Sequence, residues 1–217
     1  MKNLVRKDLR LAVIPLTWIF LAAALLTLVP GYPILLSVFF ICLGIFYSFQ
    51  QGRETNDLLY SILLPVRKRD VAKARFLTVC LLQICGFLLI ALLTLLRMTV
   101  LAGAAVYQSN PLMNASPVFL AFALLVFAAF NVCFVGGFFK TAYAIGKPFV
   151  AFSVVTLLLV FAGEALHHLP GLGFLHTPQG EHLGLQCLCL AAGIVIYAAA
   201  TLLACRRAMK RMEQIDF

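Results

Sequence analysis

The stretch RETNDLLYSILLPVRKRDVAKAR, residues 53–75, is the one long hydrophilic interruption in a chain that otherwise consists of successive apolar runs. It carries six of the seventeen Lys and Arg residues and three of the eight acidic residues. Within it, a short amphipathic segment ends at a proline and is followed by a basic cluster. A hydrophilic element of this kind between two membrane spans favours contact with a partner on one side of the membrane.

The composition indicates an integral membrane protein. Of the 217 residues, 63% are hydrophobic and 12% are charged, whereas soluble domains are about half apolar and about a quarter charged. This length accommodates about six spans of roughly 20 residues, so we expect a single membrane domain over residues 1–217 and any ATPase on a separate chain. The seven cysteines lie in or beside apolar runs without a CxxC pair, which favours packing over a disulfide framework.

The predicted fold is all-α, with six transmembrane helices. A short interfacial helix over residues 1–10 is expected to precede them, with its basic side chains reaching lipid headgroups. Residues 11–29 are long enough to span and lead directly into another apolar run, which predicts a retained first helix and not a cleaved signal peptide. The predicted spans cover residues 11–29, 34–49, 76–97, 118–139, 149–166 and 183–204.

The basic residues predict the orientation of these spans. If alternate connections lie on alternate sides, sixteen of the seventeen Lys and Arg residues share the side of both termini, and only Arg97 lies on the other. Shifting the number of spans by one would scatter these charges. The positive-inside rule therefore predicts cytoplasmic termini, and the net charge of +9 indicates a basic rim against anionic lipid, not a nucleic-acid surface.

Residues that carry catalytic or metal chemistry are few. Glu164, His167 and His168 lie at the end of the fifth span, and His176 and His182 follow them. The Glu-x-x-His spacing places two metal-ligating side chains on one helix face. However, no HExxH motif, Gly-x-Ser-x-Gly elbow or Walker-type loop accompanies them. We therefore expect polar residues at a membrane boundary, no catalytic residue, no metal and no cofactor on this chain.

Among the few strongly polar side chains inside the predicted spans, Gln83, Asn131 and Arg97 are the ones for which partners are expected. Gln83 and Asn131 are mid-span amides, which are expected to hydrogen-bond neighbouring helices. Arg97 lies about 22 residues beyond the start of its helix, near the outer interface, where burying a charge costs less than at the bilayer centre. We expect Arg97 to snorkel outward or to form an ion pair with Glu164, which reaches the same depth from the fifth span.

The hydrophilic stretch itself predicts two helices. Thr55–Asp57 is a helix-start cluster because short polar side chains cap free backbone N–H groups. Pro65 is predicted to end this first helix and to lie in the first turn of the next. The first helix carries one apolar stripe, formed by Leu58, Leu59, Ile62 and Leu63.

The basic cluster Arg67–Arg69 at the start of the second helix opposes the helix dipole, by roughly 0.3 to 1 kcal/mol for each charge. An acidic counterpart is therefore expected. Lipid phosphate and an acidic patch on a cytosolic partner are both compatible with this requirement.

The segment Leu63–Leu77, LLPVRKRDVAKARFL, preceded by the acidic Glu54, resembles the small type-2 permeases of bacterial ABC transporters, the ABC-2 family. In that family the corresponding piece typically reads Leu-Pro-Val-Ser-Arg, with an acidic residue two positions on and a basic residue before the third span. Chain size, six spans, cytoplasmic termini and the charged lead-in also agree. Arg67 departs from the pattern, since the family usually has a small hydroxyl residue there.

The resemblance implies the membrane permease subunit of an ATP-driven exporter in the bacterial plasma membrane, with peptide, antimicrobial or lipophilic cargo. It implies a coupling helix between spans two and three that docks on a separate ATPase subunit, which binds ATP and Mg. It also implies a second permease copy, identical or closely related. The residues that the resemblance assigns to ATPase coupling are Glu54, Leu63, Pro65, Val66, Lys68, Asp70 and Lys73.

Two other functions remain open at this stage. A substrate-binding membrane module of a vitamin-type uptake transporter would need a deep polar pocket at the outer face, and few intramembrane polar residues are available for one. An intramembrane metal-dependent hydrolase would use Glu164 and the histidines, and stoichiometric bound zinc would reveal it. The outer connections are too short for a substrate-capturing domain, so cargo is expected to enter from the cytoplasm or the inner leaflet.

Overall fold

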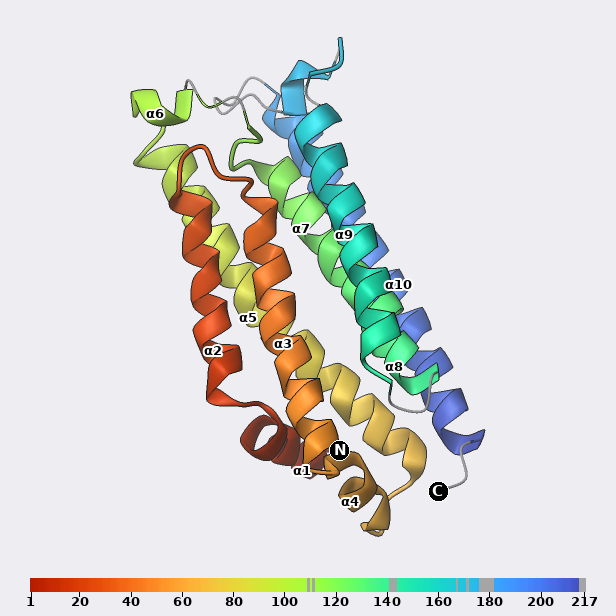
Figure 1. The fold of residues 1–217 in the computed structure, drawn as a ribbon. Coiled ribbons are helices and arrows are strands. Elements are labelled where there is room, and N and C mark those ends of the chain that lie inside the picture. Colours follow the sequence, from red (N-terminus) through yellow and green to blue (C-terminus); the bar gives the residue numbers. More distant parts are fainter. Residues whose placement is uncertain are drawn as a thin grey trace.

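The computed structural model describes residues 1–108, 110, 112–140, 144–166, 168–170, 172–175 and 182–214. Within this part, all regular structure is helical and no strand occurs (Figure 1). Five helices are long and apolar enough to cross a membrane, and a sixth crossing is counted if the bent pair over residues 2–12 and 15–28 forms one span. The prediction of an all-α, multi-pass membrane protein is therefore confirmed.

The chain runs up and down the bundle through six main segments. In order these are α2 (Pro15–Leu21) with η2 (Ala22–Leu28), α3 (Leu35–Glu54), α5 (Lys68–Thr99), α7 (Pro117–Ala129) with η3 (Phe130–Val135) and α8 (Gly136–Lys140), α9 (Gly146–Leu166) and α10 (Leu183–Gln214). The short elements α1 (Lys2–Lys7), η1 (Asp8–Ala12) and α4 (Asp57–Leu63) lie at the end that holds both termini (Figure 1). The opposite end carries α6 (Ala105–Gln108), and η4 (Gly173–Leu175) follows α9.

The first span begins later than the sequence predicts. Its helix starts at Pro15 instead of Leu11, after a bend of 89° between the lead-in and the span. Val13 and Ile14 are extended, because a proline disfavours helical backbone in the preceding residue and donates no N–H. The remaining 14 residues still extend about 24 Å, since the 3-10 turns of η2 rise about 2 Å per residue.

Three helices are longer than the predicted spans. α3 continues to Glu54, α5 begins at Lys68, and α10 continues through the basic tail to Gln214. α5 has 32 residues, which corresponds to about 48 Å, well beyond a hydrocarbon core of about 30 Å. Lys, Arg and Glu are good helix formers, so polar sequence does not end these helices at the membrane surface.

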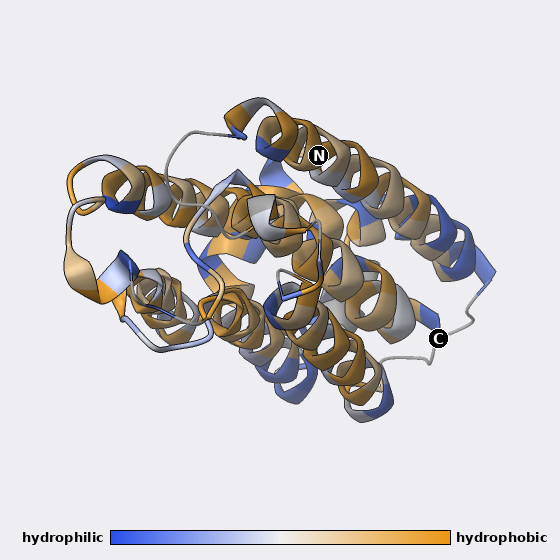
Figure 2. Ribbon diagram, turned by 90° about the horizontal axis from the view of Figure 1, so that it is seen from above, coloured by the Kyte–Doolittle hydropathy of each residue, from blue (hydrophilic) through white to orange (hydrophobic). Residues whose placement is uncertain are grey.

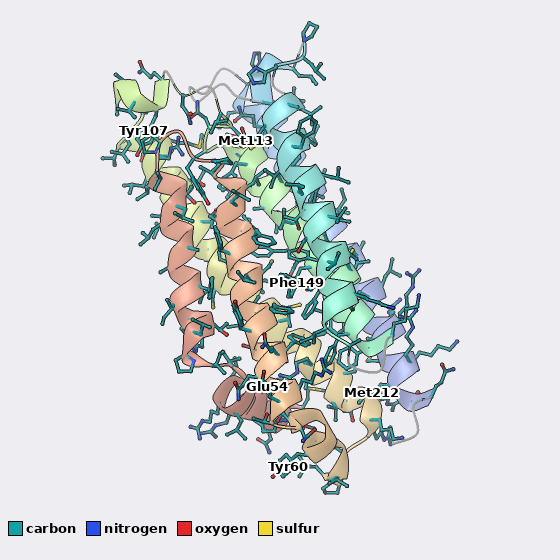
Figure 3. The ribbon with its side chains drawn as sticks, viewed as in Figure 1. Glu54, Tyr60, Tyr107, Met113, Phe149 and Met212 are labelled. Atoms are coloured by element: carbon teal, nitrogen blue, oxygen red, sulfur yellow. The ribbon has the colours of Figure 1, made fainter. Side chains whose placement is uncertain are left out.

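Aromatic rings hold the middle of the bundle together. Phe46 on α3 and Phe149 on α9, the latter labelled in Figure 3, have ring centroids 4.1 Å apart. Phe130 in η3 meets Phe152 on α9 edge-to-face at 5.0 Å. Such pairs contribute about 0.5 to 1.5 kcal/mol beyond the apolar area that they bury. Figure 2 shows the mainly hydrophobic helices that these rings join.

A small polar network also crosses the bundle. Gln83 on α5 and Asn131 in η3 exchange two hydrogen bonds of 3.0 Å. Asn131 also donates to Thr201 of α10 at 2.8 Å, and the hydroxyl of Tyr197 donates to Gln83 at 2.9 Å. Both amides are buried. The prediction that they join neighbouring helices is therefore confirmed.

The first two spans are joined by a close helix contact at Gly44. The hydroxyl of Thr17 on α2 donates to the Gly44 carbonyl of α3 at 2.8 Å and lies 2.6 Å from the hydroxyl of Ser48. A Cβ atom at Gly44 would lie only 2.4 Å from the Cβ of Phe20. This contact leaves no room for a side chain at position 44.

Replacing Gly44 by Ala is therefore expected to lower the free energy of unfolding by about 1–3 kcal/mol, because α2 and α3 must move apart. Thermal unfolding in detergent, followed by the fluorescence of Trp18, the only tryptophan, would measure this change. The control is Gly184→Ala, whose methyl group meets no atom within 4 Å. Equal stability of the two variants would contradict the proposed close contact.

Candidate functional site

A groove opens at the end of the bundle that holds both termini. It lies between α1 and the connection from α4 to α5 and has a volume of about 530 Å³. We call it the α1–α5 groove. Its walls are partly apolar and partly charged, and they include Met1, Leu4, Lys7, Pro65, Val66 and Asp70. Three of the predicted coupling residues therefore border one surface, together with residues of the lead-in helix.

The helix α4 occupies the position of the predicted coupling helix, but it starts differently. Asn56 precedes it in a left-handed conformation with φ 52°, and no side chain caps its first turn. The hydroxyl of Thr55 instead donates to the Gln51 carbonyl at 3.0 Å and so completes α3. The predicted capping role of Thr55–Asp57 is therefore wrong, because the carboxylate of Asp57 is engaged elsewhere. The side chains of Leu58, Leu59 and Ile62 lie outside the described part of the structure.

Pro65 also lies outside both helices. α4 ends at Leu63 and α5 begins at Lys68, so the predicted place of Pro65 in the first turn of α5 is wrong. The N–H of Val66 donates to the Leu64 carbonyl at 2.7 Å, which closes a three-residue turn around Pro65. The fixed φ of proline suits the central position of such a turn.

The first turn of α5 contains both charge signs. Asp70 lies there, where a carboxylate interacts favourably with the helix dipole. Arg69 lies 3.9 Å from the carboxylate of Glu213 at the end of α10, with both side chains about half exposed. An exposed pair of this kind contributes at most about 1 kcal/mol. The chain itself therefore supplies part of the acidic counterpart that the basic cluster requires.

The remaining predicted coupling residues surround this turn. Leu63 is 79% exposed and Val66 is 37% exposed. Glu54 ends α3, where it accepts a hydrogen bond of 3.2 Å from Gln50.

A second groove, of about 400 Å³, lies between the start of α5 and the end of α10. It is bordered by Lys73 together with Arg69, Asp70, Met209, Lys210 and Glu213. Asp70 thus borders both grooves, while Lys73 lies on the side towards α10. Lys68 is half-buried.

An ionic cluster that sequence reasoning did not identify lies between α4 and the rest of the bundle. It consists of Lys7, Asp8, Asp57 and Arg75. The carboxylate of Asp57 lies 2.8 Å from Arg75 and 2.9 Å from Lys7. Asp8 lies 3.1 Å from Lys7 and 3.8 Å from Arg75. The four side chains are only 7–14% exposed. Two cations and two anions from η1, α1, α4 and α5 therefore neutralise one another away from bulk water.

Further contacts hold the cluster in place. The guanidinium of Arg75 lies 5.3 Å from the centre of the Phe49 ring. Lys7 also donates to the hydroxyl of Ser61, which in turn donates to the Asp57 carbonyl at 2.7 Å. Gly52 on α3 also faces the cluster, since a Cβ atom there would lie 3.4 Å from Arg75. The lead-in helices α1 and η1, the end of α3, the helix α4 and the start of α5 therefore all contact the cluster.

The predicted contact of Lys7 with lipid headgroups is wrong, and Arg75, a basic residue at the predicted cytoplasmic start of the third span, is also buried. Arg75 lies four residues after Val71 and four before Val79, both of which are buried. This spacing places Arg75 on the buried face of α5 and is the sequence signal that would have revealed it. Its acidic partners, Asp8 and Asp57, come from two other segments, so their proximity depends on the fold.

At the opposite end of α5, Arg97 has neutral partners. Its guanidinium donates to the Thr27 carbonyl at 2.7 Å and to Asn114 at 3.2 Å, and it lies 4.2 Å from the centre of the Tyr107 ring. Figure 3 places Tyr107 at the end opposite Glu54. The carboxylate of Glu164 instead accepts the N–H of Met113 at 2.7 Å. The structure therefore does not form the expected Arg97–Glu164 ion pair, because each group has a nearer partner.

The residues suggested for metal binding do not form a metal site in the described structure. No group of three His, Cys, Asp or Glu side chains there is placed to hold a metal ion. One oxygen of the Glu164 carboxylate accepts the Met113 N–H. His167 and His176 lie outside the described part of the chain. The structure therefore offers no support for the hydrolase alternative.

A double-mutant cycle would test the separation of Arg97 from Glu164. The variants Arg97→Leu and Glu164→Gln are expected to change the unfolding free energy additively, within about 0.5 kcal/mol, because the groups do not share a partner. Arg97→Leu and Asn114→Ala form the matched cycle, and there a coupling above about 0.5 kcal/mol is expected. A coupling energy above about 0.5 kcal/mol between Arg97→Leu and Glu164→Gln would instead support a direct Arg97–Glu164 ion pair.

Asp57→Asn is expected to lower the unfolding free energy by about 3 kcal/mol, because it leaves the buried Arg75 and Lys7 with one carboxylate instead of two. The control is Glu213→Gln, which breaks the exposed pair with Arg69 and should cost at most about 1 kcal/mol. Denaturant unfolding in detergent would measure both changes. A similarly small loss in both variants would show that the ionic cluster adds little stability.

Comparison with protein families agrees with this geometry. The model described as ABC-2 family transporter protein matches residues 3–207, from the lead-in helix through the last span. No curated protein and no solved structure matches the chain. Membership implies the membrane component of an ABC transporter and association with an ABC ATPase. The continuous match, together with the multi-pass helical bundle, shows that the chain belongs to the ABC-2 family of transporter proteins.

Proposed function

We propose that this chain is the permease subunit of an ATP-driven exporter and that α4 and the following turn dock on a separate ATPase subunit. Both termini then lie on the cytoplasmic side of a bacterial plasma membrane. The observation that carries this proposal is the exposed apolar tip at Leu63 and Val66, which follows the helix whose first residue, Asp57, belongs to the buried ionic cluster.

The tip has the properties of a docking surface. Leu63 is 79% exposed and ends a helix that lies beyond the main spans (Figure 1). Burying a leucine side chain is worth about 1.5–3 kcal/mol, so a partner pocket that covers Leu63 gains substantial affinity. The neighbouring basic residues Arg67–Arg69 favour an acidic rim on that pocket.

The ionic cluster provides a mechanical link from this tip to the membrane. Asp57 is the first residue of α4, and its carboxylate contacts Lys7 in the lead-in and Arg75 in α5. A displacement of α4 by the ATPase would therefore move the first and third spans together. In this proposal Leu63, Pro65, Val66, Lys68 and Asp70 contact the ATPase, while Glu54 and Lys73 flank the contact.

The proposal also includes direction, cofactors and stoichiometry. Cargo enters from the cytoplasm or the inner leaflet, because the outer connections described here carry only the short helices α6 and η4. ATP and Mg bind to the partner ATPase, and a second permease copy, identical or closely related, completes the pathway. Peptides, antimicrobial compounds and lipophilic molecules fit an exporter of this kind.

The test is co-purification of the tagged permease with its ABC ATPase from native membranes, with the ATPase quantified by mass spectrometry. Leu63→Glu combined with Val66→Glu is expected to reduce the ATPase recovered by at least about tenfold, because it places charge in an apolar contact. The control is Arg206→Glu, which changes an exposed residue of α10 at the same end of the bundle. Undiminished recovery with the double variant would refute docking at this tip.

A further inference from the structure

On the side of the bundle opposite the α1–α5 groove there is a third groove. One of its walls is formed by η3 and α8, and the other by the last part of α10. Its volume is about 510 Å³, and we call it the α8–α10 groove. Figure 1 shows α8 beside α10 near the end that holds both termini. None of its lining residues belongs to the surface proposed for ATPase docking.

The groove combines an apolar channel with a cationic mouth. Val132 and Leu203 form exposed apolar walls, with 44% and 52% of their surfaces accessible. Lys140, Arg207 and Arg211 supply three positive charges, and no acidic residue is among the groove's lining residues. Gly136, Ala200 and Ala204, which have small or no side chains, line the space between the walls.

The dimensions of this arrangement match one membrane leaflet. Val132 lies eight residues before Lys140, and Ala200 lies eleven residues before Arg211. At 1.5 Å per residue, these separations place the apolar channel about 12 Å from Lys140 and about 17 Å from Arg211 along the helices. One leaflet contributes about 15 Å of hydrocarbon. The cations therefore lie at headgroup depth when the channel lies at acyl-chain depth.

We infer that the α8–α10 groove binds one anionic phospholipid from the leaflet that faces both termini. Its phosphate contacts Lys140, Arg207 and Arg211, and one acyl chain lies along Val132, Ala200 and Leu203. The arginine side chains suit this role because a planar guanidinium binds phosphate through paired hydrogen bonds. Only the assignment of this leaflet as cytoplasmic rests on the proposed function.

The contacts at the mouth favour a lipid over a free phosphate ion. Arg211 donates to the Gly136 carbonyl of the neighbouring element at 3.5 Å, so its side chain extends across the groove. A phosphate ion would satisfy the charges but would leave the apolar walls uncovered. A lipid satisfies both parts of the groove at once, and its phosphate would bridge α8 and α10.

Native mass spectrometry of the purified full-length chain would test this assignment by titration with phosphatidylglycerol and with phosphatidylcholine of the same acyl chains. The unmodified protein is expected to bind one phosphatidylglycerol about tenfold more tightly than phosphatidylcholine. Arg207→Gln with Arg211→Gln should abolish this preference. The matched control, Arg206→Gln with Lys210→Gln, removes the same charge from the same helix outside this groove and should retain the preference.

The acyl-chain part of the site has its own variant. Ala200→Phe fills the channel but keeps all three cations, and it is expected to weaken phosphatidylglycerol binding about tenfold. Glycerol phosphate, which has the headgroup phosphate without acyl chains, should not displace the lipid. Trp18 fluorescence would verify that each variant is folded. These measurements do not involve the ATPase, so their outcome is independent of the docking test.

Four results would overturn the inference. Equal loss of preference in both double variants would indicate general surface charge instead of a site. Unchanged binding by Ala200→Phe would show that the channel holds no acyl chain. Displacement of the lipid by glycerol phosphate, or occupation of the groove by a second copy of the chain, would identify a different occupant.

Discussion

The pairing of Arg75 inside the protein constrains the whole end of the bundle that holds both termini. A guanidinium removed from water must be compensated by opposite charge and hydrogen bonds, because an unpaired buried charge costs several kcal/mol. Asp57 and Asp8 supply that compensation, and they come from α4 and η1. The lead-in, the short helix and the third span must therefore occupy their observed positions together.

The shape of the first span follows from the same requirement. Lys7 and Asp8 reach the cluster only because the chain bends by 89° before Pro15, which turns the lead-in across the end of the bundle. Val13 and Ile14 make the bend as extended residues ahead of the proline. A straight helix from Leu11 would carry these two charges away from Asp57 and Arg75.

Two buried arginines divide α5 into a membrane part and an extension. Arg75 and Arg97 are 22 residues apart, which corresponds to about 33 Å along the helix and is close to the hydrocarbon thickness. Arg75 is held by carboxylates, whereas Arg97 is held by a carbonyl, an amide and an aromatic ring. The three grooves described above lie at the end marked by Arg75, whereas a small cavity lined by Arg97, Tyr107 and Asn114 lies at the opposite end.

The sequence by itself determined the class of the protein, because apolar runs of membrane length and the one-sided distribution of basic residues are local and additive signals. It also determined that Gln83 and Asn131 needed helix partners, and it located the short helix between the second and third spans. The ends of the helices were harder to predict, since polar residues such as those of α10 continue a helix as well as apolar ones.

Only the tertiary structure decided the partners of the buried arginines. Arg75 pairs with Asp57 and Asp8, and Arg97 bonds to Thr27 and Asn114 instead of Glu164. Ion pairs between segments up to 67 residues apart depend on how the helices pack, and no local sequence pattern encodes that arrangement.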